Sequence, residues 1–290
     1  MRLSPLPSRC HSPFQQLALR VSATTCAVIG CLGIAASASL AAPISYSIPP
    51  GSMPDLSQHD GGWTNFCAPT AGANAVNFFA NTFDGTLTPA TQNGLITALS
   101  ADMNTNGVSG PPAHQGTYDT DLRDGLDLYL ENNDGNPSTS VWNTTLLKMG
   151  DPRPGGGTID GLDLLAKSQD ILSNGGAVIL IIDWMTGPPD ELLYDLPTPP
   201  QPGLMKHAIS LAGYNPTDLE IHDPANQLTH ATGVTDIVPY TATPASWQLS
   251  IGGPIPNAIV DGIVFVPVPE PGTAMLLLAG LGALALRRRG

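Results

Sequence analysis

A cysteine, a histidine and an aspartate occur in this chain in an order that could support nucleophilic catalysis. Cys67 precedes a helix-forming run, His207 begins an apolar strand-like run, and Asp223 follows the next strand-like run, 16 residues after His207. A thiolate attacks carbonyl carbons, an imidazole takes and returns the proton, and a carboxylate orients the imidazole. This set predicts acyl chemistry through a thioester intermediate.

The cysteine content directs attention to Cys67. The chain has four cysteines, and the other three, Cys10, Cys26 and Cys31, lie in an N-terminal segment that we expect to be removed. Proteins that use disulfides for stability usually carry an even number of cysteines. A single thiol is either a reactive group or a small buried hydrophobic residue, and both interpretations stay open at this point.

His207 is the histidine best placed to act as a base. Four of the six histidines lie in the N-terminal segment or in polar stretches: His11, His59, His114 and His230. His222 adjoins Asp223, but the alternation of a strand would place these two side chains on opposite faces. His207 heads an apolar strand, which is a rigid position. A hairpin between the two strands would bring Asp223 beside its ring.

The elements that must position these groups can be predicted from periodicity and breaker residues. We expect helices at 68–80, 88–103, 119–131 and 160–173, and strands at 141–148, 177–184, 206–215, 219–224, 245–251 and 258–268. Helices come first and antiparallel strands follow, which is an α+β order with no internal repeat and no second folded domain. Cys67 would stand at a helix N-terminus, where unpaired N–H groups and the helix dipole stabilise a thiolate.

Four segments together resemble the C39-like cysteine peptidase family. CAPTAGANAV is similar to that family's nucleophile helix, and NGGAVILIIDW, KHAISLAGYN and LEIHDPA are similar to its strand, His strand and Asp strand, over roughly residues 53–267. The resemblance implies a papain-like α+β fold, with N-terminal helices, including the nucleophile helix, followed by an antiparallel sheet. It implies a peptide-bond hydrolase with Cys67 as nucleophile, His207 as base and acid, and Asp223 as orienting carboxylate.

The oxyanion hole departs from the family pattern. Such enzymes usually place a Gln about six residues before the cysteine, and Gly61 occupies that position here. The amide side chains available nearby are Gln58 and Asn65, and the backbone N–H of Cys67 would be the second donor. The choice between these two side chains stays open.

Both ends of the chain read as targeting segments. The N-terminal segment has basic residues up to Arg20, then an apolar run, and then small residues before Pro43. This pattern predicts a secretory signal peptide over 1–41, cleaved after Ala41 or else after Ala38. An anchor helix is the alternative. The C-terminal segment 268–290 contains Pro-Glu-Pro, an apolar run and three arginines. It resembles the PEP-CTERM sorting tail, which implies an exosortase in an exopolysaccharide-producing Gram-negative bacterium and surface or extracellular localisation.

Composition and motifs indicate which kinds of partner residues 42–267 can bind. This segment has five Lys and Arg against 23 Asp and Glu, and the whole chain has a net charge of −13, which argues against nucleic-acid binding. No cofactor or metal is expected, because zinc spacings, phosphate loops and nucleotide fingerprints are absent from the sequence. We expect a peptide or protein substrate, the export machinery, an exosortase and transient membrane contact through the C-terminal segment.

Two other functions remain open alongside hydrolysis. The missing Gln and the sorting tail are also typical of a catalytically weak or inactive protein that binds the cell surface or an exopolysaccharide matrix. The same three residues could instead transfer an acyl or amide group to an amine.

Overall fold

The computed structural model describes the chain in ten segments, which define the part of the protein considered below. They are residues 45–58, 65–82, 87, 91–107, 116–134, 142–183, 192–193, 206–224, 236–250 and 258–268. The chain divides into two units between residues 41 and 42, and all the described residues belong to the second unit.

The described segments contain four α-helices and one short 3-10 helix, η2. Their bounds are α2 Cys67–Thr82, α3 Gln92–Asp102, η2 Thr105–Gly107, α4 Asp119–Asn133 and α5 Gly161–Ser173. Local capping explains two of the starts: Thr91 accepts a hydrogen bond from the Gly94 N–H in the first turn of α3, and Asp160 forms a capping box with Asp163 in the first turn of α5. The four helices predicted from the sequence are therefore confirmed, with ends shifted by at most four residues.

The described segments also contain ten strands, which form one sheet. Their bounds are β1 Tyr46–Ser47, β2 Thr117–Tyr118, β3 Thr145–Lys148, β4 Ala177–Asp183, β5 Leu192–Leu193, β6 Lys206–Tyr214, β7 Asp218–His222, β8 Asp236–Ala242, β9 Trp247–Leu249 and β10 Ala258–Val266. Six of them pair in a ring, β6–β4–β10–β9–β8–β7, and β7 pairs again with β6. Every pairing in this ring is antiparallel, so these strands form a closed barrel.

Bulges bend two of the longest barrel strands. The register shifts between Leu211 and Gly213 in β6 and between Val260 and Gly262 in β10. A bulge increases the local twist and bend of a strand, which favours closure of a sheet. A Cβ atom at Gly262 would lie 2.9 Å from the Leu147 carbonyl oxygen of the neighbouring β3, so glycine permits the close pairing at this bend.

The predicted papain-like fold, with N-terminal helices followed by an antiparallel sheet, is wrong. The sheet closes into a six-stranded barrel, and helices and strands interleave: β1 precedes α2, β2 lies between α3 and α4, and α5 follows β3. Closure depends on β8, which pairs with both β7 and β9 and was not among the expected strands. A set of strands without β8 has two free edges, which explains why the sequence pattern alone did not indicate a barrel.

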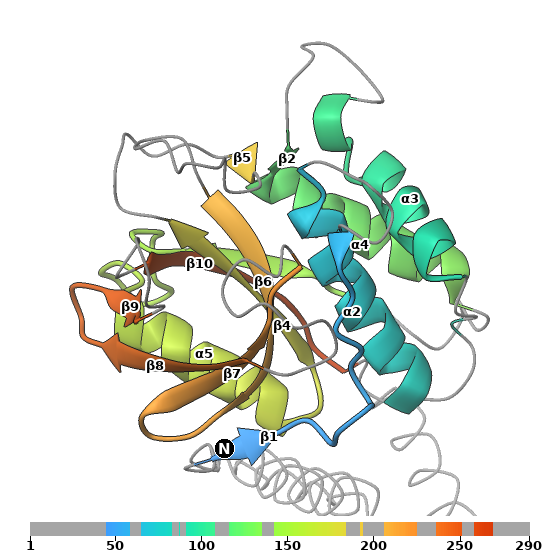
Figure 1. Cartoon of the computed structure of the whole chain (residues 1–290). Coiled ribbons are helices and arrows are strands. Elements are labelled where there is room, and N and C mark those ends of the chain that lie inside the picture. Colours follow the sequence, from blue (N-terminus) through green and yellow to red (C-terminus); the bar gives the residue numbers. More distant parts are fainter. Residues whose placement is uncertain are drawn as a thin grey trace, which may run out of the picture. The chain divides into compact units, whose positions relative to one another are not determined.

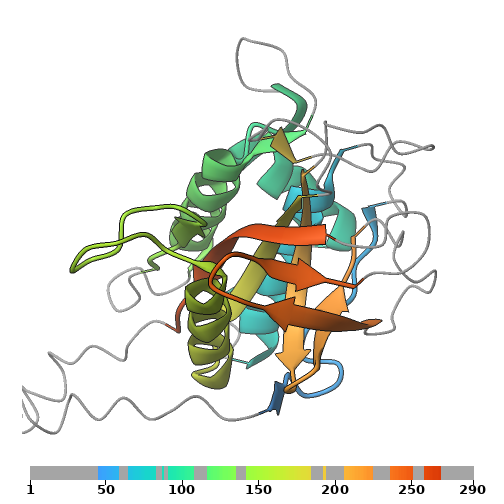
Figure 2. The ribbon, with the colours of Figure 1, turned by 90° about the vertical axis from the view of Figure 1, so that its left-hand side faces the viewer.

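The helices pack on different parts of this barrel. Figure 1 shows α2, α3 and α4 grouped together, with α2 against β4 and β6, whereas Figure 2 shows α5 lying along the barrel strands. One hydrophobic core joins the helices to the sheet, with fully buried side chains such as Phe78 of α2, Leu126 of α4 and Trp247 of β9. Within the described segments, none of the helices combines the length and apolar character that a membrane span requires.

Candidate active site

Cys67 is the first residue of α2, and its side chain is completely buried. Asn65, two residues earlier, has a φ angle of 62°, so the chain turns through a left-handed conformation immediately before the helix. Pro69 lies within the first turn, where its missing N–H costs no helical hydrogen bond. The N-terminus of a 16-residue helix therefore lies at the sulfur, an arrangement that stabilises negative charge.

His207 lies near the start of β6, a barrel strand with a neighbouring strand on each side. Its Cα pairs with Ile182 of β4, and β7 flanks β6 on the opposite side. Asp223 follows β7 directly. The hairpin of β6 and β7 brings the two side chains together, so that His207 Nε2 and Asp223 Oδ1 lie 2.7 Å apart with both residues 1% exposed.

The His207–Asp223 contact determines the role of each ring nitrogen. A carboxylate accepts hydrogen bonds, so Nε2 of His207 carries a proton and donates it to Asp223. The other nitrogen, Nδ1, is also buried. Because Nε2 is bonded to Asp223, Nδ1 is the ring nitrogen available to interact with the Cys67 sulfur.

Burial and two acidic neighbours act in opposite directions on the pKa of His207. Burial by itself disfavours the charged imidazolium, but the negative charges of Cys67 and Asp223, with hydrogen bonding to both side chains, outweigh it. The pKa of His207 consequently lies well above its ordinary value of 6.5. A protonated imidazole held between a cysteine and a carboxylate is the arrangement that thiol catalysis requires.

The two predicted oxyanion residues lie in different places. Gln58 is completely buried, and its backbone N–H donates to the Pro224 carbonyl at 2.9 Å, which places it next to Asp223. Asn65 is half-buried in the turn before Cys67. Gly61, at the position where the family usually has Gln, lies outside the described residues.

His222, the neighbour of Asp223, faces another group. Its Nδ1 lies 3.0 Å from the carbonyl oxygen of Pro54. A carbonyl oxygen only accepts, so this nitrogen carries a proton and donates it. His222 therefore contacts the N-terminal segment, whereas Asp223 contacts His207.

Two sets of buried polar residues near the site were not predicted from the sequence. Asn74 on α2 and Ser210 on β6 are both completely buried and hydrogen-bonded to each other at 3.2 Å. Lys206, next to His207, is 2% exposed and contacts Asp261 at 2.7 Å and Asp119 at 3.4 Å. A polar side chain inside an otherwise apolar helix or strand pattern was the available signal in each case.

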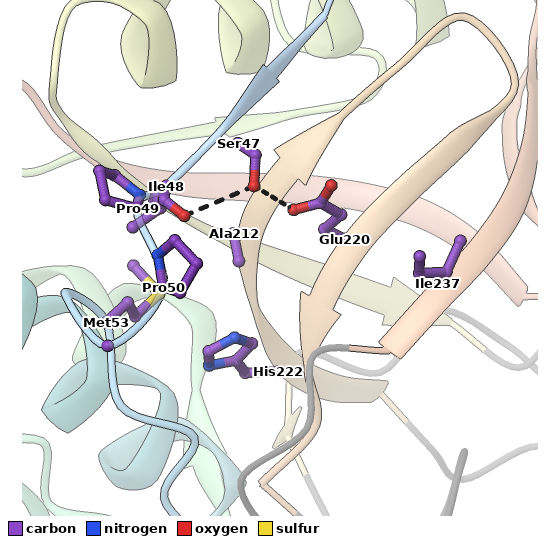
Figure 3. A pocket seen from close by; sticks show the side chains of 10 residues that line it. Ser47, Ile48, Pro49, Pro50, Met53, Ala212, Glu220, His222 and Ile237 are labelled. Atoms are coloured by element: carbon purple, nitrogen blue, oxygen red, sulfur yellow. Dashed lines mark hydrogen bonds between the residues drawn. The ribbon is translucent and has the colours of Figure 1, made fainter.

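A pocket of about 270 Å³ lies beside these elements but is separate from the three candidate catalytic residues (Figure 3). The segment 47–53 forms one wall, and residues of β6, β7 and β8 form the other, including Ala212, Glu220, His222 and Ile237. None of Cys67, His207 and Asp223 lines it. Among the described residues, no group of three or more His, Cys, Asp or Glu side chains is arranged to hold a metal ion.

Comparison with known proteins agrees with both resemblances drawn from the sequence. Residues 52–250 match the Peptidase_C39 like family, and residues 267–289 match the PEP-CTERM protein-sorting motif, which indicates an exported protein that an exosortase sorts to the cell surface. No curated protein matches the chain. A crystal structure from Bacillus anthracis, described as a candidate C39-like peptidase, shares 16% sequence identity with a TM-score of 0.41 and covers 77% of this chain and 98% of that one. The chain therefore belongs to the Peptidase_C39 like family and carries a C-terminal PEP-CTERM motif.

Proposed function

We propose that this protein is an exported cysteine peptidase that hydrolyses peptide bonds through a thioester on Cys67. The observation that carries the proposal is the buried hydrogen bond of 2.7 Å between His207 and Asp223, beside a cysteine that raises the pKa of the histidine. Membership of the Peptidase_C39 like family supports the same reaction class.

In the first half of the reaction, the Cys67 thiolate attacks the carbonyl carbon of the scissile peptide bond. A C–S bond forms, and the carbonyl electrons move to the oxygen to give an oxyanion. As this intermediate collapses, the C–N bond breaks and His207 Nδ1 gives its proton to the departing amine. Asp223 accepts the hydrogen bond from Nε2 throughout and so keeps Nδ1 directed at the reacting groups.

In the second half, water hydrolyses the thioester. Nδ1 of His207 takes a proton from the water, whose oxygen attacks the carbonyl carbon, and the C–S bond breaks to release a carboxylic acid. The thiolate and the protonated imidazole are then restored. We assign stabilisation of both oxyanions to the Cys67 backbone N–H and to one amide side chain, Gln58 or Asn65. Gln58 is favoured because its backbone is tied to Pro224, adjacent to Asp223.

The test combines hydrolysis with the reactivity of the thiol. The purified protein is incubated with a peptide library, and the products are identified by mass spectrometry for the wild type, Cys67→Ala and His207→Ala. In parallel, the rate of iodoacetamide alkylation is followed on the Cys67 peptide from pH 5 to pH 9. An isolated thiol reacts only as the pH approaches about 8.5. We expect cleavage that both substitutions abolish, and alkylation that persists at pH 6 in the wild type and is lost in His207→Ala.

The same assay separates the transfer alternative. Hydroxylamine added to the peptide reaction would intercept a thioester as a hydroxamate. Preferential reaction with amines over water would identify an acyl transferase. Unchanged cleavage in Cys67→Ala would exclude Cys67 as the nucleophile.

A second function, binding of the cell surface or of an exopolysaccharide matrix without turnover, is favoured by one observation. The candidate catalytic groups are closed off: Cys67 is completely buried, and His207 and Asp223 are each 1% exposed. A substrate reaches the sulfur only if neighbouring residues move. Retention on an exopolysaccharide column, together with a Cys67 that alkylates only near pH 8.5, would establish binding in place of catalysis.

We also propose a mature body over residues 42–267, after removal of the signal peptide 1–41 and processing of the segment 268–290. The match of residues 267–289 to the sorting motif supports the second boundary. We place the mature protein at the cell surface, outer membrane or extracellular matrix of a Gram-negative bacterium. Mass spectrometry of the protein recovered from culture fractions tests both ends.

A further inference from the structure

Asn74 connects three parts of the candidate active site. It lies on α2, seven residues after Cys67, and a separation of seven residues returns to nearly the same helix face. Its side chain is completely buried, and asparagine is a poor residue for a helix interior. A buried amide at this position is therefore explained by its partners and not by helix formation.

Both polar atoms of the Asn74 side chain form hydrogen bonds. Its Nδ2 donates to Ser210 Oγ at 3.2 Å, and its Oδ1 accepts from the Leu56 N–H at 3.1 Å. Ser210 Oγ also donates to the Ala71 carbonyl at 3.3 Å, so two hydrogen bonds join Ser210 of β6 to α2. All these groups are buried, where a lost partner is not replaced by water.

Each partner of Asn74 lies close in sequence to a candidate catalytic residue. Ser210 follows His207 by three residues on β6, and Leu56 precedes Gln58 by two residues. Asn74 itself shares a helix with Cys67. One amide thus contacts the segments that carry the base and the favoured oxyanion residue, and it lies on the helix of the nucleophile.

Leu56 and Gln58 belong to a segment that we call the N-terminal strap, residues 45–58. The strap begins at β1, which pairs with β6, and Figure 3 shows its first part, with Ser47 bonded to Glu220 and Met53 beside His222. Two backbone contacts anchor it further, Ile48 N–H to the Ala212 carbonyl at 2.8 Å and Gln58 N–H to the Pro224 carbonyl at 2.9 Å. Asn74 supplies the link from the strap to the nucleophile helix.

We propose that Asn74 is a positioning residue, which through Ser210 and Leu56 holds the nucleophile helix, the His207 strand and the strap in the arrangement that activates Cys67. The inference rests on the proposed function, because it concerns the geometry of the same thiol. Asn74 acts through these neighbours and touches none of the reacting atoms. A displacement of about 1 Å between reacting groups is enough to reduce rates about a hundredfold.

The test compares Asn74→Ala, Asn74→Asp and Ser210→Ala with the wild type. Asn74→Asp keeps the acceptor for Leu56 and loses the donor for Ser210, and it covers the possibility that Asn74→Ala does not fold. The matched control is Thr105→Val, which removes another completely buried side-chain hydrogen bond, the 2.7 Å contact of Thr105 with Thr117. The folded fraction of each variant is measured by circular dichroism, and the variants are compared at equal concentrations of folded protein.

Two readouts separate positioning from a merely structural effect. We expect the Asn74 and Ser210 variants to lose alkylation of Cys67 at pH 6 by roughly ten- to a hundredfold and to lower kcat with little change in KM. Thr105→Val should leave the shape of the alkylation profile unchanged. Folded Asn74 and Ser210 variants with the wild-type profile and kcat would overturn the positioning role while leaving the proposed function intact. A wild type that alkylates only near pH 8.5 would overturn the proposed function, and the positioning role with it.

Discussion

His207 Nε2 lies 2.7 Å from Asp223 Oδ1, although the two residues are 16 positions apart in the chain and neither is more than 1% exposed. The β6–β7 hairpin makes this contact, because His207 lies near the start of one strand and Asp223 follows the end of the other. A hydrogen bond to an ionised group is strong when both partners are removed from water. This contact orients the His207 ring, and several measurable properties depend on it.

The titration of His207 should depend on its two acidic neighbours. Because the negative charges of Cys67 and Asp223 raise the pKa of His207 against the effect of burial, Cys67→Ser and Asp223→Asn should each lower it. NMR titration of the His207 ring protons measures the change. The folded-state pKa lies above the unfolded value of about 6.5, so the stability contributed by His207 is fully present below that pH and is lost as the pH rises through the folded value. A His207 titration that is the same in Cys67→Ser as in the wild type would show that no ion pair exists.

The two candidate oxyanion residues can be distinguished by their variants. Gln58→Ala should lower kcat by about 10²- to 10³-fold, the usual effect of removing one oxyanion donor. Asn65→Gly removes the other amide while keeping a residue that tolerates the φ angle of 62°, and it should retain most of the activity. Steady-state kinetics on one cleaved peptide decides between them, and the opposite pattern would assign the role to Asn65. If neither variant loses activity, the oxyanion hole does not use a side-chain amide.

The buried charge of Lys206 should contribute to stability through its acidic partners. Lys206→Met removes the ammonium group that Asp261 and Asp119 contact at 2.7 and 3.4 Å. Asp119 keeps Lys148 at 3.1 Å and the Asp261 side chain is 28% exposed, so the expected cost is about 1–3 kcal/mol in the free energy of unfolding. Lys167→Met is the control, because Lys167 forms an exposed ion pair with Asp170 whose loss should cost only about 0–1 kcal/mol. Urea denaturation measures both values. Equal effects of the two substitutions would show that the Lys206 pair contributes no more than a surface contact.

Two helical glycines should respond differently to alanine. A Cβ at Gly125 of α4 would lie 2.6 Å from the Met103 backbone nitrogen and 2.7 Å from the Asp102 carbonyl carbon, so Gly125→Ala should cost about 1–3 kcal/mol despite the better helix propensity of alanine. A Cβ at Gly72 of α2 would meet Met103 Cε at 2.9 Å, the mobile end of a flexible side chain. Gly72→Ala should therefore stay within about 1 kcal/mol of the wild type. Thermal unfolding measures the stability of both variants. If Gly125→Ala is as stable as the wild type, α3 and α4 can move apart without loss of stability.

Much of the candidate site could be predicted from local sequence. The start of α2 at Cys67 follows from a turn residue, a proline in the first turn and an apolar helical run, all within a few positions. The hairpin that joins His207 to Asp223 follows from two strand patterns separated by a short turn. Signals of this kind act between neighbours in the chain, so they are readable without knowledge of the fold.

The closure of the sheet could not be predicted in the same way. Pro239 lies in the middle of β8, and proline argues against a strand inside a sheet because it cannot donate a backbone hydrogen bond. In the structure Pro239 pairs with Asp218, the first residue of β7, and its carbonyl accepts from the Ser250 N–H at 2.8 Å. Its position at the end of the β7 ladder makes the proline acceptable, and that position exists only once β7, β8 and β9 have paired.

The sequence by itself thus determined the family, the helices and the order of the three candidate catalytic residues, since these depend on residue type and short spacing. Tertiary structure alone decided the barrel, the partners of Asn74 and the burial of Lys206 between Asp119 and Asp261. The physical reason is distance along the chain. Asn74 meets Ser210 136 positions away and Lys206 meets Asp119 87 positions away, and such contacts are selected by packing and desolvation of the whole core.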